Sequence, residues 1–374
     1  MSALSDAAVV HFSRGIPPLE AIPSEQLADH TAFVLEERRD EVFQYAPIGR
    51  HRGDPALRTQ LGAFHGVDPE RIFVGNGSLQ VLDLVAALLL GAGGDVIVET
   101  PTYDRAVGIV ERHGGRLVNV PLEPDGIDLE RLRDVLRDRP APAFLYTIPD
   151  FQNPSGVTTS AAKRRALAEL AAEYGFPILE DVPYRELRYH GETPPLLGEL
   201  AGDARVITLG SLSKVLSPGL RVGYAIVDPD TATALAALAE GTYLSPSPLC
   251  QAIAARCLAS GTVGEHIEHV RDFLRPRHDA ALAAVREHLG DALLAVPNGG
   301  YYLAAHLPVG VDEPTLLRAA RDEGVVLTPG SAFYPGSASP PAGTLFVRLP
   351  FQALEPEEFA SGIERLARLS STLR

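Results

Sequence analysis

The sequence predicts an α/β fold, with a large domain built on a mostly parallel, seven-stranded sheet flanked by helices, and a smaller α+β domain after it. Two observations support this prediction. From Arg71 onward, short apolar segments rich in β-branched residues alternate with amphipathic helical segments, as expected for a parallel sheet with helical connections. After about Tyr243 this alternation stops, and a long helical region precedes a different mixture of strands and helices. We therefore expect an N-terminal segment at 1–40 that packs with the small domain and the active site, the large domain at 41–245, and an interdomain helix with the small domain at 246–374.

Two short helices are expected before the sheet, at 24–39 and 55–65, separated by the loop sequence FQYAPIGRHRGD. The seven predicted strands contain the segments RIFVGN, DVIVET, RLVNVP, AFLYTIP, FPILEDV, RVITLGS and RVGYAIV. The helices between them are predicted at 78–90, 103–113, 129–137 and 160–174. Ser160 is the expected N-cap of the last helix, and Gly175 lies just past its end.

The smaller domain is predicted from the elements that follow. A helical region covers 248–289, and the proline after Arg275 is expected to break or kink it. Strands are expected in GGYYLAAHL, VVLT and TLFVRLP, with a helix at 313–323 and a last helix from Pro356. In a two-domain enzyme of this kind, the cleft between the domains is the expected ligand site.

Composition excludes several classes of protein. The 374 residues include 33 Lys and Arg against 48 Asp and Glu, which gives a net charge of −15 and argues against a nucleic-acid partner. The two cysteines, Cys250 and Cys257, form no metal-binding motif and are typical of thiols in a reducing compartment. Residues 1–11 lack the pattern of a signal peptide, and no apolar run is long enough to span a membrane. We expect a cytoplasmic protein.

The first chemical signal is the glycine-rich sequence GNGSLQ at 75–80, between a predicted strand and a predicted helix. Such a turn exposes backbone N–H groups at the positive end of a helix and is typical of a phosphate site. A dinucleotide-binding loop is an alternative, since Glu99 stands where its ribose-binding acid would be, but Gln80 occupies the position of its third glycine. A tight turn without a ligand is the other alternative.

The second signal is GSLSKVLSPGLRVGY at 210–224, in which Lys214 follows a predicted strand. Hydroxyl groups surround this lysine, and Arg221 follows seven residues later. Hydroxyls and a guanidinium fix a phosphate ester, and a lysine near cations loses its proton readily and becomes a nucleophile. A surface lysine in a serine-rich loop is the structural alternative.

Polar side chains also stand at the ends of other predicted strands. Asp181 ends PILEDV and Tyr184 follows three residues later, while Asn153 follows AFLYTIP and Tyr103 follows DVIVET. The carboxyl ends of parallel strands form the crevice in which ligands of α/β proteins bind. There a carboxylate can pair with a heterocyclic N–H⁺, and an aromatic ring can stack on a flat cofactor.

These motifs together resemble the fold-type I pyridoxal-phosphate enzymes, and within them the class I/II aminotransferases. The resemblance is strongest to the branch that holds the 2-aminoadipate and kynurenine aminotransferases and the catalytic domain of MocR-type regulators. It extends from FSRGIPP near the start to FVRLP near the end of the chain. The implied function is transfer of an amino group from an L-amino acid to a 2-oxo acid, expected to be 2-oxoglutarate, by a ping-pong mechanism.

The resemblance also implies roles for individual residues. Lys214, Asp181 and Tyr184 would be catalytic: Lys214 would hold the cofactor and move a proton, and Asp181 would keep the pyridine nitrogen protonated. Tyr184 and Asn153 would bind the phenolic oxygen of the cofactor, and Tyr103 would stack on its ring. The phosphate would be held by Gly77, Ser78, Leu79, Ser211, Ser213 and Arg221.

The resemblance further implies a substrate site and a partner. Arg348, in FVRLP, would bind the α-carboxylate of the substrate, together with Asn153 and the backbone of Gly15. Tyr45, in QYAPIG, would reach the phosphate of a neighbouring subunit, which implies a homodimer with active sites at the subunit interface. No metal site is expected, since the pair in HIEH at 266–269 is typical of a helix surface.

The chain departs from the family pattern at two positions. Leu79 stands where relatives often have Gln, which keeps a backbone donor and loses a side-chain donor. Arg14 stands in HFSRGIPP where small residues are common, and either meets a distal carboxylate of the substrate or is simply solvated.

Two other functions are compatible with these residues. The first is a different reaction on the same cofactor, namely β-elimination, decarboxylation or oxidation, because fold does not determine reaction. The second is a regulator that senses the cofactor. Only about forty residues precede QYAPIG, which is short for a DNA-binding domain and its linker, so we expect an enzyme.

Overall fold

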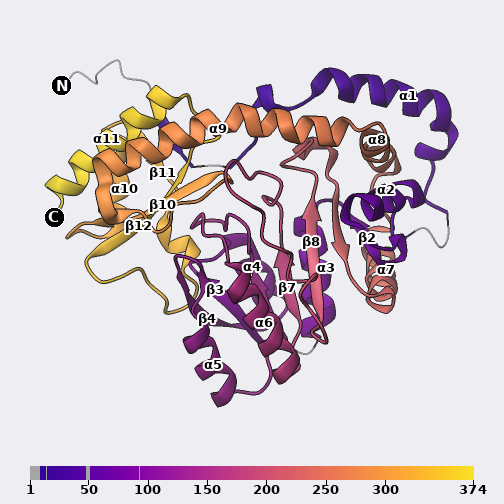
Figure 1. Cartoon of the computed structure of the whole chain (residues 1–374), viewed down its shortest axis with the longest axis horizontal. Helices are drawn as coiled ribbons and strands as arrows, with labels where there is room; N and C mark the ends of the chain where they lie inside the picture. The colour runs from indigo at the N-terminus through magenta and orange to yellow at the C-terminus, as the bar shows by residue number, and fades with distance from the viewer. Residues whose placement is uncertain (1–8, 14, 48–50, 92) are drawn as a thin grey trace.

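The computed structural model describes residues 9–13, 15–47, 51–91 and 93–374 of the chain. Its main feature is an eight-stranded sheet with the strand order β2-β9-β8-β7-β6-β3-β4-β5 (Figure 1). The strands of this sheet are β2 (Ile72–Gly75), β3 (Gly94–Thr100), β4 (Gly115–Glu123), β5 (Gly126–Ile127), β6 (Phe144–Thr147), β7 (Ile178–Asp181), β8 (Val206–Ser211) and β9 (Gly223–Ile226). All seven predicted strands are present, and only the two-residue strand β5 was not predicted.

The sheet is mostly parallel, as predicted. β3 pairs in parallel with β4 and β6, and the parallel pairing continues from β6 to β7 and from β7 to β8. β9 runs antiparallel to both β8 and β2. Every residue of β2, β6, β7 and β9 is buried, because helices and loops cover both faces of the sheet.

Six of the seven helices described in the first two thirds of the chain were predicted from the sequence pattern, and only α7 was not. They are α1 (Ser24–Val42), α2 (Pro55–His65), α3 (Ser78–Leu90), α4 (Asp104–Arg112), α5 (Leu129–Asp138), α6 (Ala161–Tyr174) and α7 (Pro229–Tyr243). At the start of α6, the side chain of Ser160 accepts a hydrogen bond from the Lys163 amide, and Gly175 ends the helix in the left-handed conformation. Both predicted caps are therefore confirmed.

The C-terminal third contains α8 (Pro248–Ala259), α9 (Thr262–Leu289), α10 (Glu313–Asp322) and α11 (Pro356–Thr372). The expected break at the proline after Arg275 is wrong, since α9 continues through Pro276 and crosses the molecule as one long helix (Figure 1). The interruption lies instead at Gly261, whose φ of 84° is the left-handed conformation that glycine readily adopts. Buried side chains on both sides of the proline, such as Leu274 and His278, hold α9 in place.

The small sheets of the C-terminal third include a strand from the beginning of the chain. β10 (Tyr302–Pro308) pairs antiparallel with β12 (Thr344–Pro350), and β1 (Val10–Phe12) pairs in parallel with β11 (Val325–Leu327). Phe12 is fully buried, and its ring lies 5.2 Å from that of Phe359. This pairing was not predicted, and it directs the residues after Phe12 toward the large sheet. The domain boundaries at 40/41 and 245/246 stay predictions.

Two further expectations concern the whole chain. Among the described residues, no helix is both long and apolar enough to cross a membrane. Cys250 and Cys257 are both free thiols, and Cys257 is buried.

Candidate active site

Lys214 lies just beyond the end of β8, and its ammonium group points at the N-terminal segment. Its Nζ donates a 2.8 Å hydrogen bond to the carbonyl oxygen of Gly15. Burial, and then the positive charges of Arg221 and Arg348, lower the pKa of Lys214 to about 8. A lysine with this pKa is partly neutral near physiological pH and can act as a nucleophile.

The chain contains only one other lysine, Lys163, and it is engaged elsewhere. Lys163 lies in α6 and forms ion pairs with Glu123 and, at 2.8 Å, with Asp125. Its ammonium group is thus neutralised by two carboxylates at the far end of β4. Lys214 is therefore the only lysine that can serve as a nucleophile in a buried site.

Asp181, the last residue of β7, presents a buried carboxylate with one unused oxygen. Its Oδ2 accepts a 3.0 Å hydrogen bond from the hydroxyl of Tyr146, whereas its Oδ1 has no partner among the described residues. Burial raises the pKa of Asp181 to about 7, and the hydrogen bond from Tyr146 opposes this shift. A buried acceptor without a partner is rare in native proteins, so Oδ1 calls for a donor such as the N–H⁺ of a heterocyclic ring.

The glycine-rich turn before α3 is shaped for an anion. Gly77 caps the helix with φ 89°, and no side chain caps its N-terminal amides. A Cβ atom on Gly77 would lie 2.2 Å from Nη2 of Arg221, so the guanidinium lies directly against the turn. A helix N-terminus beside an arginine binds a phosphate through amides and charge together. This geometry favours a phosphate site over a tight turn without a ligand.

Arg348 occupies the middle of β12, where its guanidinium is buried between two aromatic rings. Its Cζ lies 4.9 Å from the ring centroid of Tyr302 and 4.8 Å from that of Phe333. Nη1 donates to Oδ1 of Asn153 and Nη2 donates to the carbonyl of Ser13, both at 2.8 Å. Its Nε has no partner among the described residues. Stacked and held in this way, the guanidinium is oriented to bind a carboxylate.

A family comparison decides what this arrangement is. The model of the family described as aminotransferase class I and II matches residues 11–366, which is nearly the whole chain. The chain belongs to the class I and II aminotransferases. It is therefore an enzyme of amino-group transfer, and its cofactor is pyridoxal 5′-phosphate.

Individual relatives agree with this assignment. The chain is 36% identical over 364 residues to a 2-aminoadipate transaminase of Thermus thermophilus, covering 96% of this chain and 89% of the relative. It is 33% identical to aromatic-amino-acid aminotransferase 1 of Thermococcus litoralis, over 96% of this chain and 87% of that protein. The crystal structure of the Thermus α-aminoadipate aminotransferase complexed with N-(5′-phosphopyridoxyl)-L-leucine matches with a TM-score of 0.89 and 35% identity. That match covers 98% of this chain and 92% of the crystallised one.

The residues of this aminotransferase fit pyridoxal phosphate at both ends of the cofactor. The unpaired Oδ1 of Asp181 offers an acceptor for the pyridine nitrogen, and the bare turn at Gly77 with Arg221 offers donors for the phosphate. Ser211 ends β8 and pairs with Gly223, on which a Cβ atom would lie 2.0 Å from the Ser78 amide nitrogen. The Oγ of Ser211 accepts a 3.1 Å hydrogen bond from the Ser213 amide. The fold thus brings together the glycine-rich turn and the serine-rich loop that are far apart in sequence.

The structure places the remaining predicted site residues either near Lys214 or on the surface of the chain. The ring of Tyr184 is buried, with its centroid 6.0 Å from Nζ of Lys214. Tyr103 lies at the start of α4, and burial followed by the charge of Asp181 raises the pKa of its hydroxyl. Leu79 is partly exposed at the start of α3, and Tyr45 is 76% exposed, so the single chain does not bring Tyr45 into the site. Arg14 lies outside the described residues.

The N-terminal segment forms one wall of the site. Ser13 O accepts from Arg348 and from the Thr328 hydroxyl, Gly15 O accepts from Lys214, and Ile16 O accepts from Gln352. A Cβ atom on Gly15 would lie only 1.8 Å from the hydroxyl oxygen of Tyr302, so no larger residue fits there without movement. The predicted contact of the Gly15 backbone with the substrate carboxylate stays a prediction, while Ser13 and Gly15 contact Arg348 and Lys214.

Three residues of the site were missed in the sequence. Tyr146 bonds to Asp181, Tyr302 lies under Arg348 with its hydroxyl 3.3 Å from that of Tyr184, and Tyr301 lies 5.4 Å from Nζ of Lys214. A signal for Tyr302 exists in the strand alternation. Ala304 pairs with Arg348, so Tyr302 lies on the same face of β10 as a diagonal neighbour of that arginine.

Proposed function

We propose that this aminotransferase transfers the amino group of a bulky or aliphatic L-amino acid to 2-oxoglutarate, with Lys214 and Arg348 as the two residues that contact the amino acid. Aromatic rings of Tyr302 and Phe333 flank the guanidinium of Arg348, which favours donors with an apolar side chain. The name of one relative, an aromatic-amino-acid aminotransferase, is compatible with such donors, whereas the 2-aminoadipate named for another carries a side-chain carboxylate.

One observation carries this proposal. Lys214 and Arg348 donate hydrogen bonds to the carbonyls of Gly15 and Ser13, which stand two residues apart in the sequence. The lysine and the guanidinium therefore both contact the same N-terminal segment. An amino acid whose α-carboxylate replaces Ser13 O on Arg348 would extend its Cα toward the lysine.

The chain's own residues account for binding and proton transfer. Arg348 would bind the α-carboxylate with Nη2 and its unpaired Nε, while Asn153 keeps Nη1 in place. Lys214 Nζ would take the proton from the substrate Cα and return it, a role for which its pKa of about 8 is suited. Pyridoxal phosphate, when bound, supplies the ring system that accepts the electrons of the Cα–H bond.

Other residues would hold the cofactor in register with Lys214. Asp181 would keep the pyridine nitrogen protonated, Tyr103 would stack on the ring, and Tyr184 and Asn153 would bind the phenolic oxygen. The phosphate would be bound by Gly77, Ser78, Leu79, Ser211, Ser213 and Arg221. Ser13, Gly15 and Ile16 would exclude water from Lys214 and Arg348 once the substrate is bound.

A homodimer is part of the proposal. Phe43 is 69% exposed and Tyr45 is 76% exposed, and with Leu244 they line a surface hollow of about 600 Å³. The hollow adjoins the glycine-rich turn, since Asn76 accepts a hydrogen bond from the amide of Ser247 on its rim. A partner chain at this surface would bury these rings and allow its Tyr45 to reach the phosphate of this chain. The two free thiols are compatible with a cytoplasmic location.

The test is a half-reaction assay on the purified enzyme loaded with cofactor. Amino acids are added singly, and the yellow absorbance of the lysine-bound cofactor should bleach with the true donor and return with 2-oxoglutarate. Release of ammonia, carbon dioxide or pyruvate without a 2-oxo acid would show a different reaction on the same cofactor. Bleaching that no 2-oxo acid reverses would contradict the proposed transfer.

A further inference from the structure

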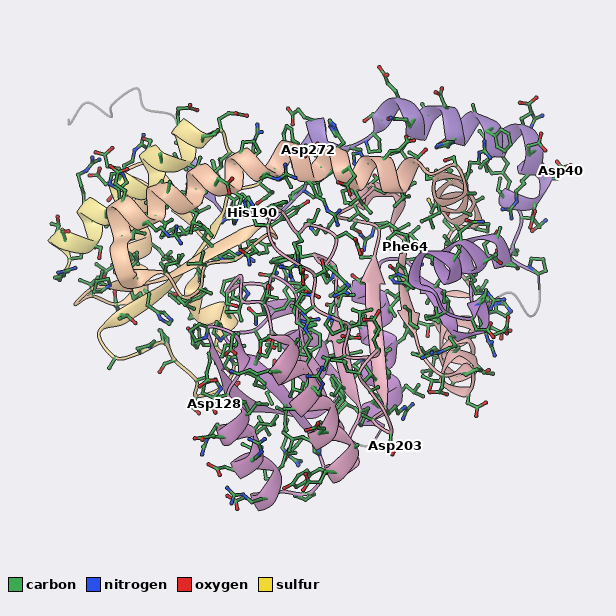
Figure 2. The ribbon with its side chains drawn as sticks, in the orientation of Figure 1. Asp40, Phe64, Asp128, His190, Asp203 and Asp272 are labelled. Atoms are coloured by element: carbon green, nitrogen blue, oxygen red, sulfur yellow. The ribbon has the colours of Figure 1, made fainter. Side chains whose placement is uncertain are left out.

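Three polar side chains, two of them exposed and one buried, meet beside the long helix α9, and none of them belongs to the residues assigned to the candidate active site. His278 and Asp279 belong to the long helix α9, and His190 belongs to the chain between β7 and β8. Their donor atoms all lie within 4.8 Å of one another. Figure 2 labels His190 against α9, and the side chains of His190 and Asp279 are about half exposed. His278 is only 1% exposed.

The hydrogen bonds of His278 determine where its proton lies. Nε2 is 2.9 Å from the carbonyl oxygen of Pro297, which only accepts, so Nε2 carries the hydrogen. Nδ1 is 2.9 Å from Oδ1 of Asp279, which is also an acceptor at neutral pH. Two lone pairs therefore face each other across this contact. A positive charge is needed between them, either a second proton on the ring or a metal cation.

The surroundings of His278 hold its ring in this orientation. The ring packs 5.3 Å from that of Tyr189 and 5.5 Å from that of Phe351, so Nδ1 stays directed at Asp279. His190 contributes a second nitrogen, with Nε2 2.7 Å from the same Oδ1 of Asp279. A ring N–H donated to a backbone carbonyl is also the arrangement found behind histidines that bind metals.

We propose that His190 Nε2, His278 Nδ1 and the Asp279 carboxylate form a site for a divalent transition-metal cation of the Zn²⁺ type. Two imidazoles and one carboxylate are a donor set that Zn²⁺ accepts in proteins, with water as a fourth ligand. Bonds of about 2.1 Å in tetrahedral geometry place donor atoms about 3.4 Å apart. The two short contacts, of 2.7 and 2.9 Å, must therefore widen by roughly 0.5 to 0.7 Å, which the partly exposed side chains of His190 and Asp279 permit.

The site would brace α9 against segments that lead into the active site. The amides of Tyr189 and His190 both donate to the carbonyl of Asn298, the residue after the one bonded to His278. Four residues beyond Asn298 comes Tyr302, which lies under Arg348. A bound cation would join the helix to this segment, so its first effect is expected on thermal stability.

The experiment uses tag-free holoenzyme that has been treated with EDTA and then freed of chelator. Zn²⁺ is titrated by calorimetry, and the thermal midpoint is measured with and without one equivalent of the ion. We expect one ion per chain and a higher midpoint in the wild type. His190→Ala and Asp279→Ala should each weaken binding at least tenfold and abolish the midpoint shift, since both residues are exposed enough to be replaced without unfolding.

Two further variants make the result specific. His278→Gln keeps a donor for Pro297 O while removing the ligand, so loss of Zn²⁺ binding in a folded variant supports the role of the imidazole. His113→Ala is the matched control, because His113 forms a 3.0 Å pair with Asp83 and should leave binding unchanged. The proposal is overturned if the wild type does not bind Zn²⁺, or if the His190 and Asp279 variants bind it equally well. It is also overturned if the midpoint responds to pH and not to the metal, since a proton then occupies the gap.

Discussion

The ammonium group of Lys214 donates a 2.8 Å hydrogen bond to the carbonyl oxygen of Gly15, 199 residues earlier in the chain. Arg348 makes the matching contact to Ser13 with the same length. The N-terminal segment thus occupies, through its backbone carbonyls, the groups that are proposed to receive the substrate. An incoming amino acid must replace these carbonyls, so the segment influences both affinity and access.

Gly15→Ala should impair catalysis while the protein stays folded. The new Cβ would lie 1.8 Å from the Tyr302 hydroxyl, so either the segment or that ring must move. A displacement of this size near the reacting groups is expected to lower kcat/KM by about ten- to a hundredfold. Gly108→Ala in α4 is the control, because its Cβ would meet nothing within 4 Å and kcat/KM should be unchanged. Equal kinetics in the two variants would refute a close fit at Gly15.

Arg348→Lys should raise KM for the amino acid while the cofactor remains bound. Lysine keeps the charge and loses the planar fork, together with the hydrogen bond that Nη1 makes to Asn153. The expected increase in KM is about ten- to a thousandfold, by analogy with the loss of a charge-assisted pair of hydrogen bonds. Steady-state kinetics measure it, and the cofactor absorbance of the resting enzyme is the control. A variant with unchanged KM would remove Arg348 from the carboxylate site.

Attachment of the cofactor to the apoenzyme should follow the ionisation of Lys214. Burial, and then the charges of Arg221 and Arg348, lower the pKa of this lysine from 10.5 to about 8. The neutral amine is the nucleophile, so the rate should rise about tenfold per pH unit below pH 8 and level off above it. Stopped-flow absorbance gives this profile. Arg348→Gln removes one nearby positive charge and should move the profile to higher pH, whereas a rise that continues to pH 10 would indicate an ordinary lysine.

The apoenzyme should lose stability as the pH rises because of Asp181. Burial raises its folded-state pKa from 3.8 to about 7, whereas the unfolded chain keeps the ordinary value. Between these values the folded state holds a proton that the unfolded state has released. The contribution of Asp181 to the free energy of unfolding is therefore complete below about pH 4 and is lost as the pH rises through 7. The loss is on the order of 4 kcal/mol for this buried group.

Urea unfolding of the apoenzyme at pH 5 and pH 8 measures this effect. Asp181→Asn cannot ionise, so the free energy of unfolding of the variant should fall less between the two pH values than that of the wild type. Other buried carboxyls, such as Glu99, are common to both proteins and cancel in the comparison. Parallel pH profiles would show that Asp181 does not titrate as its burial suggests. The same variant should also bind pyridoxal phosphate more weakly and lose most of its activity.

Much of the fold could be predicted because hydrophobic periodicity reports burial directly. Strands such as β7 are short apolar runs between helical segments, and Ser160 and Gly175 bound α6 through local chemistry. The pairing of β1 with β11 could not be predicted, because three residues carry too little pattern and the partner is distant in sequence. The break assigned to the proline in α9 failed because packing of the helix outweighs one missing hydrogen bond.

The candidate site also contains residues that could be predicted from the sequence and residues that could not. Residues within compact motifs, such as Lys214 and Asp181, could be proposed from the sequence because each motif has a local chemical meaning. Tyr146 and Tyr301 were missed because their importance depends on contacts with residues far along the chain. Tyr45 stays a prediction, since its proposed contact is to a second chain.

The sharpest test of the proposed site uses the two lysines of the chain. The holoenzyme is reduced with borohydride, which fixes pyridoxal phosphate to the lysine that holds it, and the digested protein is mapped by mass spectrometry. We predict one phosphopyridoxyl group per chain, on the peptide that contains Lys214. A label on Lys163, or on neither lysine, would contradict the assignment of Lys214 and the mechanism built on it.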